Sequence, residues 1–217
     1  MLKKAAIFDL DGTLINSLPD ISASMNRVLA AHGLPVYPIA DYCYMVGNGA
    51  RVLAQRAVGK DRQDLAEPVL RDYREMYSAH SREETFVYDG IRQMLRGLRE
   101  RGMLLGVLSN KDDPDVREVI HYYFDPSPFT LLRGRLPGVP LKPDPASALA
   151  AAEALGVSPA DCWYVGDTNV DAQTAFAAGM HFVGAGWGFR TEEELRRAGA
   201  RFVAQTPLQA LDIMLEK

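Results

Sequence analysis

A short apolar run near the start of the chain ends in two aspartates, and no other feature constrains the fold as much. Ala5 to Phe8 has the length and apolar character of a buried β-strand, and Asp9 and Asp11 come directly after it. Because residues i and i+2 of an extended chain point the same way, both carboxylates should leave the strand side by side. Two such charges repel each other unless a cation or a proton separates them. The run therefore predicts a metal site, or acid–base and nucleophilic chemistry, at the strand's carboxyl end.

Three later segments also carry polar side chains where an apolar strand or a turn ends. They run from Leu104 to Lys111, from Lys142 to Pro145 and from Trp163 to Asp171. Open α/β sheets bind their ligands just beyond the carboxyl ends of the strands. The repetition favours one shared site over the alternative that Asp9 and Asp11 are solvated acids in a turn.

Strand-like and helix-like segments alternate along most of the chain, which predicts a parallel sheet covered on both faces. The expected strands are 5–8, 104–108, about 129–132, 163–165, 182–185 and 202–203. The expected helices in this part are 90–101, 114–123, 145–155, 171–178 and 207–215. From 18 to 86 there is no convincing core strand, and the helical stretches there are 20–31, 50–58 and 64–77.

With these four motifs in this order, the chain resembles the haloacid dehalogenase-like superfamily of phosphohydrolases. The resemblance spans nearly the whole chain and is specific for the superfamily, but much less so for the substrate. It implies an α/β fold with a Rossmann-like, doubly wound parallel sheet as the core, formed by residues 1–17 and 87–217. Residues 18–86 would form an inserted α-helical cap domain, with an ordinary packing subdomain as the alternative.

The resemblance also implies a catalytic role for each motif. Asp9 would be the nucleophile that forms an aspartyl-phosphate, and Asp11 would protonate the leaving oxygen and later take a proton from water. Mg²⁺ would bind the Asp9 carboxylate, the backbone carbonyl of Asp11 and the Asp167 carboxylate. Asp171 would orient metal-bound water or Lys142, and if a helix starts at Asp167 both acids would lie on one helix face. A helix N-terminal charge is the alternative role for Asp171.

The transferring phosphoryl group needs cationic and hydrogen-bonding neighbours. Ser109 and Asn110 would bind it through hydroxyl and backbone N–H groups, and Thr13 would add a contact. Lys142 would balance the charge of the acids and the phosphate. Lys111 is expected to be a solvated neighbour of this motif.

Substrate choice is expected to depend on the run from Val46 to Arg51, which looks like a cap segment of phosphoglycolate phosphatases. The run from Gly186 to Gly188 shares this resemblance. Asn48 and Arg51 are the candidate substrate contacts, because an arginine can pair with a carboxylate or phosphate. The alternative is a simple loop with a surface arginine. Asn16 departs from the aspartate that relatives commonly carry, which affects only the connection into the cap.

Composition narrows the remaining classes. The net charge of −4 over 217 residues gives no basic footprint for nucleic acid, and no segment is long and apolar enough for a membrane span. Composition thus favours a cytoplasmic protein, and the resemblance implies a phosphatase of a small phosphorylated metabolite, with its oligomeric state open. Asp11 argues against a dehalogenase, and Lys60 is a poor Schiff-base lysine for a phosphonatase. A sugar phosphomutase, an inorganic pyrophosphatase and a non-catalytic phosphate-binding scaffold remain as alternatives.

Overall fold

The computed structural model of the chain describes residues 4–124 and 128–216. Contacts within the chain divide it into two compact units. The core unit comprises Met1–Ile15 and Val87–Lys217, and the helical unit comprises Asn16–Phe86.

The core unit is built on a six-stranded sheet in which each neighbouring pair is parallel, with strand order β5-β4-β1-β6-β7-β8. The strands are β1 Ala5–Phe8, β4 Leu104–Asp112, β5 Leu131–Arg135, β6 Cys162–Gly166, β7 His181–Ala185 and β8 Phe202–Ala204. β1 is central because each of its four residues is fully buried and apolar, as a strand covered on both faces requires. The predicted α/β fold with a parallel, doubly wound sheet is confirmed.

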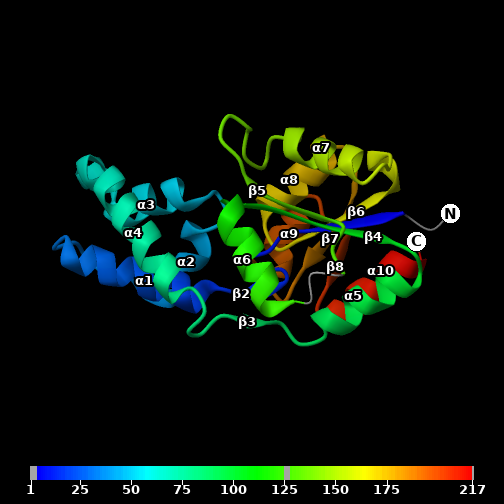
Figure 1. The fold of residues 1–217 in the computed structure, drawn as a ribbon, viewed down its shortest axis with the longest axis horizontal. Helices are drawn as coiled ribbons and strands as arrows, with labels where there is room; N and C mark the ends of the chain where they lie inside the picture. The colour runs from blue at the N-terminus through cyan, green and yellow to red at the C-terminus, as the bar shows by residue number, and fades with distance from the viewer. Residues whose placement is uncertain (1–3, 125–127, 217) are drawn as a thin grey trace. The chain divides into compact units, whose positions relative to one another are not determined.

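Helices cover both faces of this sheet (Figure 1). On one face the side chains of Ala6 and Phe8 pack with α5 Ile91–Glu100, α6 Asp113–Tyr123 and α10 Pro207–Glu216. On the other face Ala5 and Ile7 pack with α7 Ala146–Ala154, α8 Asn169–Ala177 and α9 Glu192–Arg197. A short 3-10 helix, Pro159–Asp161, precedes β6. Alternate residues of one strand thus belong to two separate apolar clusters.

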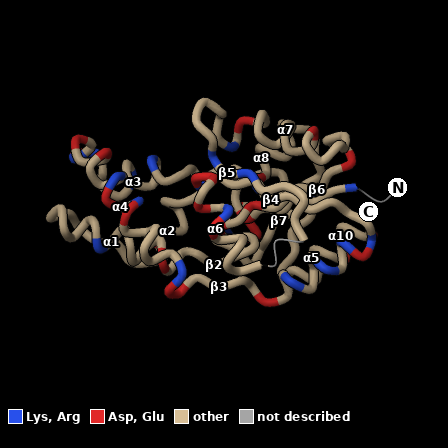
Figure 2. The backbone as a smooth tube through the Cα atoms, in the orientation of Figure 1, with Lys and Arg blue, Asp and Glu red and all other residues tan. Residues whose placement is uncertain are grey.

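The helix α5 illustrates why these segments fold as surface helices. Its apolar side chains recur at helical spacing and are buried, whereas its arginines lie between them and colour the tube blue along α5 in Figure 2. The buried set is Ile91, Met94, Leu95 and Leu98. A charged outer face and an apolar inner face stabilise such a helix only against a core.

The helical unit contains four α-helices and a 3-10 turn. They are α1 Leu18–Ala31, α2 Ile39–Met45, α3 Ala50–Val58, the 3-10 segment Lys60–Leu65 and α4 Ala66–His80. The chain enters and leaves through two short strands that pair with each other, β2 Ile15–Asn16 and β3 Phe86–Val87. Buried Asp20 ties the exit to α1, because its carboxylate accepts hydrogen bonds from the backbone N–H groups of Glu84 and Thr85 at 2.9 Å.

Two helices were absent from the sequence expectations. α2 is a single short segment after Pro38 with only Tyr42 buried, so its apolar period is weak. α9 begins with a capping box between Thr191 and Glu194, a start signal that its short length obscured. The helix expected over 64–77 begins instead at Ala66, after the 3-10 segment. Among the described residues, no helix combines the length and apolarity needed to span a bilayer.

Candidate active site

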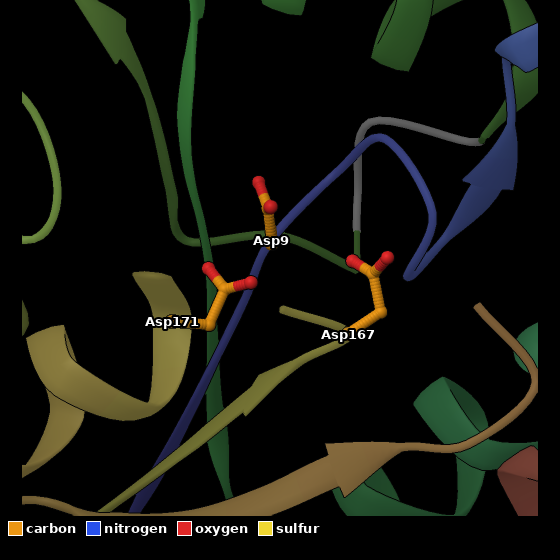
Figure 3. A group of neighbouring side chains, drawn as sticks. All are labelled: Asp9, Asp167 and Asp171. Carbon is orange, nitrogen blue, oxygen red and sulfur yellow. The ribbon is translucent and has the colours of Figure 1, made fainter. Parts of the chain in front are cut away.

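Three aspartates converge at the carboxyl edge of the sheet (Figure 3). Asp9 follows β1, Asp167 follows β6 and Asp171 lies in the first turn of α8, and one oxygen from each lies within 4.8 Å of the others. β1 and β6 are paired in parallel from Ala5 to Phe8, so their ends must emerge together. All three carboxylates are buried.

Lys142 supplies the positive charge of this cluster. Its ammonium lies 3.0 Å from Asp9 Oδ1 and 2.7 Å from Asp171 Oδ1, and all three side chains are nearly inaccessible to water. Burial alone would lower the pKa of Lys142, but the carboxylates of Asp171 and Asp9 hold this pKa well above its ordinary value. The lysine is therefore a fixed cation between two acids.

Asn110 holds the backbone of Lys142 in place. Its side-chain amide donates to the Lys142 carbonyl at 3.1 Å and accepts from the Lys142 N–H at 2.9 Å. Asn110 is predicted from the sequence only as a phosphate-binding residue, because its contact with a residue 32 positions later has no local sequence signal. The same side chain thus fixes the position from which the lysine reaches Asp9.

The orientation of the Asp167 carboxylate is fixed by hydrogen bonds to both of its oxygens and by close packing. Its Oδ1 accepts from the Thr13 hydroxyl at 3.0 Å and its Oδ2 accepts from the Phe189 N–H at 2.9 Å. A β-carbon at Gly12 would lie 2.3 Å from Asp167 Oδ2, and the φ of +84° there also favours glycine. Burial, together with the charges of Asp171 and Asp9, raises the pKa of Asp167 well above its ordinary value.

The run from Gly186 to Gly188 closes this side of the cluster. Trp187 donates from its indole Nε1 to the Thr13 carbonyl at 2.9 Å. A β-carbon at Gly188 would lie 2.2 Å from Asp167 Cβ and 2.4 Å from the Gly12 carbonyl. From the sequence this run is only a family resemblance. In the structure, Gly188 is required for the close approach to Asp167, and Trp187 fixes the loop against Thr13.

Burial raises the pKa of Asp9 to about 7, with Asp171 and Asp11 adding to the shift and Lys142 opposing it. Three buried carboxylates therefore lie together where water cannot screen them, and the Lys142 ammonium pairs with only two of them, Asp9 and Asp171. A divalent cation with a preference for oxygen ligands fits this donor set, because it would relieve the repulsion that otherwise favours protonation. Asp9 and Asp167, with the backbone carbonyl of Asp11, remain the predicted Mg²⁺ ligands.

Asp171 is engaged on both oxygens. Oδ1 accepts from Lys142, and Oδ2 accepts from the Thr168 hydroxyl at 2.7 Å and its N–H at 3.1 Å, so Asp171 completes the capping box of α8. The condition for Asp167 and Asp171 to share a helix face is not met, because the helix begins at Asn169, after Asp167. The two acids meet through the tight turn at Thr168. Asp171 fits the role of holding Lys142, and its helix-cap role is present as well.

The expectation that Lys111 is a solvated neighbour of the site is wrong. Its ammonium is not solvated but lies 3.0 and 3.1 Å from the two carboxylate oxygens of Asp11, and its side chain is 7% exposed. Asp11 is 19% exposed. The pairing spans 100 positions of sequence and depends on how β1 and β4 align.

The predicted phosphate-binding residues lie near the same edge. Ser109 and Asn110 are nearly buried at the end of β4, and Ser109 Oγ accepts from the Lys111 N–H at 3.3 Å. Thr13 is fully buried and its hydroxyl donates to Asp167. Phosphate binding by these residues stays a prediction.

The predicted substrate contacts in the helical unit have partners within that unit. Arg51, in the first turn of α3, forms an exposed ion pair with Glu67 of α4. Asn48 Oδ1 accepts from Arg56 Nη2 at 2.9 Å. Neither contact is buried, so neither commits the side chain strongly to its partner.

Comparison with known proteins agrees with this geometry. The family model described as haloacid dehalogenase-like hydrolase matches residues 6–185. A phosphoglycolate phosphatase of Pseudomonas putida is 38% identical over 87% of this chain and 71% of its own. A phosphoglycolate phosphatase of Xanthomonas campestris pv. campestris is 31% identical over 88% of this chain and 86% of its own. A solved structure from Lactobacillus delbrueckii subsp. bulgaricus superimposes with a TM-score of 0.94 and 28% identity, covering 100% of both chains.

Proposed function

Because the chain belongs to the haloacid dehalogenase-like hydrolases and is a phosphatase, we propose that it cleaves a small phosphate monoester by way of a phosphoryl group held on Asp9. The observation that best supports this route is the buried contact of Asp9 with Lys142, 3.0 Å apart. A buried carboxylate fixed beside a cation and aimed from a strand end is a positioned nucleophile.

In the first step an oxygen of Asp9 forms a bond to phosphorus while the bond to the leaving oxygen breaks. Asp11 donates the proton that this oxygen needs. Lys142 lies against Asp9 and offsets the negative charge that gathers there, and Ser109 with Asn110 provides donors for the phosphoryl oxygens.

In the second step a water molecule attacks the phosphorus of the aspartyl-phosphate. Asp11, now a carboxylate, takes the proton of that water, and the bond from phosphorus to Asp9 breaks. The enzyme returns to its starting state with inorganic phosphate released. Two easier displacements thereby replace one very slow hydrolysis.

Mg²⁺ is the proposed cofactor. Asp9, Asp167 and the backbone carbonyl of Asp11 would hold it, and Asp171 would keep Lys142 at its side. When bound, the ion would supply positive charge to the phosphoryl oxygens. Thr13 and Phe189 orient the Asp167 carboxylate for this role by donating to one oxygen each.

The proposed substrate is 2-phosphoglycolate. Two relatives at 38% and 31% identity are phosphoglycolate phosphatases, and the substrate's carboxylate matches a guanidinium. Arg51 is the proposed reader of that carboxylate, with Asn48 as its neighbour. The exposed pair of Arg51 with Glu67 is weak enough to exchange for a substrate anion.

The test is a phosphate-release assay with 2-phosphoglycolate and p-nitrophenyl phosphate, each with Mg²⁺ and with EDTA. Arg51→Ala should lower kcat/KM for phosphoglycolate about tenfold to a hundredfold, the range of a lost charged hydrogen bond, and should affect the aryl ester much less. Glu67→Gln is the matched control, since it removes the partner of Arg51 but keeps the guanidinium. Equal losses on both esters would mean that Arg51 does not read the carboxylate.

The identity of the substrate is tested by comparing esters with the wild-type protein. If phosphoglycolate is hydrolysed no faster than a generic ester, the substrate proposal fails while the phosphatase assignment stands. Turnover of pyrophosphate, or transfer of phosphate between sugar positions, would instead favour the pyrophosphatase or phosphomutase alternative.

A further inference from the structure

The ion pair between Lys111 and Asp11 is unusual in how completely it is held. The ammonium contacts both carboxylate oxygens, at 3.0 and 3.1 Å, and the two side chains are 7% and 19% exposed. Exposed lysine–carboxylate pairs in proteins shift freely and contribute little. This one is shielded from water and grips both oxygens.

The backbones that carry the two residues are also fixed. Lys111 belongs to β4, and its N–H donates to Ser109 Oγ. Asp11 forms a backbone bridge with Ile15. The next residue of β4, Asp112, pairs with Arg135 of β5. The ammonium therefore approaches Asp11 from a strand whose position is set on both sides.

We propose that Lys111 is a positioning residue for proton transfer, which orients the Asp11 carboxyl toward the leaving oxygen and later toward water. This rests on the proposed function, in which Asp11 is the acid and base. A free aspartate side chain turns about two torsions, and a two-oxygen contact selects one orientation from that set. General acid catalysis depends on such placement.

The contact can persist through both steps. When Asp11 carries a proton, one oxygen is a hydroxyl and the other still accepts a hydrogen bond from the ammonium. The hydroxyl gives its proton to the ester oxygen as that oxygen takes the electron pair of its bond to phosphorus, and Asp9 forms the new bond. In the second step the water proton passes to the Asp11 carboxylate as the water oxygen bonds to phosphorus. The electron pair of the bond between phosphorus and Asp9 returns to Asp9.

The proposal predicts a dependence on the leaving group. An alkyl phosphate releases a poor leaving group that needs the proton, whereas 2,4-dinitrophenyl phosphate releases an anion that does not. Lys111→Met should reduce kcat/KM for 2-phosphoglycolate and for ethyl phosphate about tenfold to a hundredfold, part of the usual contribution of a general acid. The kcat/KM of the dinitrophenyl ester should fall less than about threefold, because kcat/KM ends at phosphoryl transfer to Asp9 and does not include the later attack of water. Lys111→Arg should recover most of the loss.

Lys4→Met is the matched control, because Lys4 forms an exposed pair with Asp161 at 3.2 Å. It should leave kcat/KM for all three esters unchanged. If Lys111→Met unfolds, Lys111→Gln carries the same comparison, with circular dichroism confirming the fold and Lys111→Arg remaining the rescue variant.

Three results would overturn the role of Lys111. Equal losses of kcat/KM on the alkyl and dinitrophenyl esters would mean that it binds the phosphoryl group or supports the fold. A loss on phosphoglycolate without a loss on ethyl phosphate would mean that it binds the substrate carboxylate. No loss on any ester would mean that the pair does not act in catalysis. The Asp9 route is tested apart from this, by a burst of dinitrophenol in the wild-type protein, and its absence would count against that route alone.

Discussion

Gly188 and Asp167 are packed so closely that a β-carbon at position 188 would lie 2.2 Å from the Asp167 Cβ. Real β-carbons do not approach other atoms to that distance, and the Gly12 carbonyl at 2.4 Å blocks escape on another side. The position of the carboxylate that follows β6 thus depends on a glycine 21 residues further along the chain. Trp187, bonded to the Thr13 carbonyl, holds that glycine's loop in place.

Gly188→Ala should therefore displace Asp167. We expect a higher half-saturating Mg²⁺ concentration and a fall in kcat of about a hundredfold, the scale of a small misplacement in an active site. Titrating activity against Mg²⁺ measures both. Gly106→Ala is the control, because a β-carbon there would meet its nearest neighbour at an ordinary 3.5 Å. Normal metal dependence in Gly188→Ala would contradict the proposed role of Asp167.

Asp9→Asn should abolish turnover while leaving the fold intact, because an amide is not a competent nucleophile for phosphorus. Phosphate release and thermal unfolding measure the two effects. In the wild-type protein, beryllium trifluoride should form its complex on Asp9, which crystallography can locate. Full activity in Asp9→Asn would rule out the covalent route through Asp9.

Lys142→Met should destabilise the metal-free protein, because it leaves the buried carboxylates of Asp9 and Asp171 without their cation. We expect a loss of about 3–5 kcal/mol in the free energy of unfolding at pH 8, the usual cost of breaking a buried pair. Urea denaturation measures it. Lys4→Met removes an exposed pair and should change stability by less than about 1 kcal/mol. Similar values for the two variants would show that the buried cluster does not depend on its lysine.

The pH dependence of metal binding follows from Asp9. Its pKa is raised from 3.8 to about 7 by burial, so between these values the folded state binds more protons than the unfolded state. The metal-free protein should therefore lose stability as pH rises through this window. Mg²⁺ needs the carboxylate that the proton occupies, so it should raise the melting temperature more at pH 8 than at pH 6. An equal shift at both values would contradict this competition.

The strands and most helices of the core unit could be predicted from local sequence patterns. The strands beginning at Ala5, Leu104 and Cys162 are short apolar runs that end in polar residues, and such runs form buried parallel strands wherever helices cover them. Their shared edge then places Asp9 and Asp167 together without further information. Helices with strong apolar periods, such as α5, were equally evident.

The wrong expectations came from contacts that local patterns do not encode. Lys111 looked solvated because a lysine beyond a strand usually is, and only the alignment of Phe8 with Val107 brings it level with Asp11. The condition for a shared helix face of Asp167 and Asp171 is not met, because Thr168 caps a helix that begins only at Asn169. Both outcomes depend on tertiary register and capping, which single residues do not reveal.

The Asn110 side chain pairs with both backbone groups of Lys142, as the backbone of a neighbouring strand would: it donates to the carbonyl and accepts from the N–H. These two bonds reproduce one step of β-sheet pairing through a side chain. They tie Lys142 directly to β4, in addition to the connection of residues 136–141 that leads to it from β5. Insertions or deletions in that connection should reshape the surface and leave the lysine where it is. Lys142 is thereby held by the sheet itself, and a change in length of the loop before it becomes a change at the surface alone.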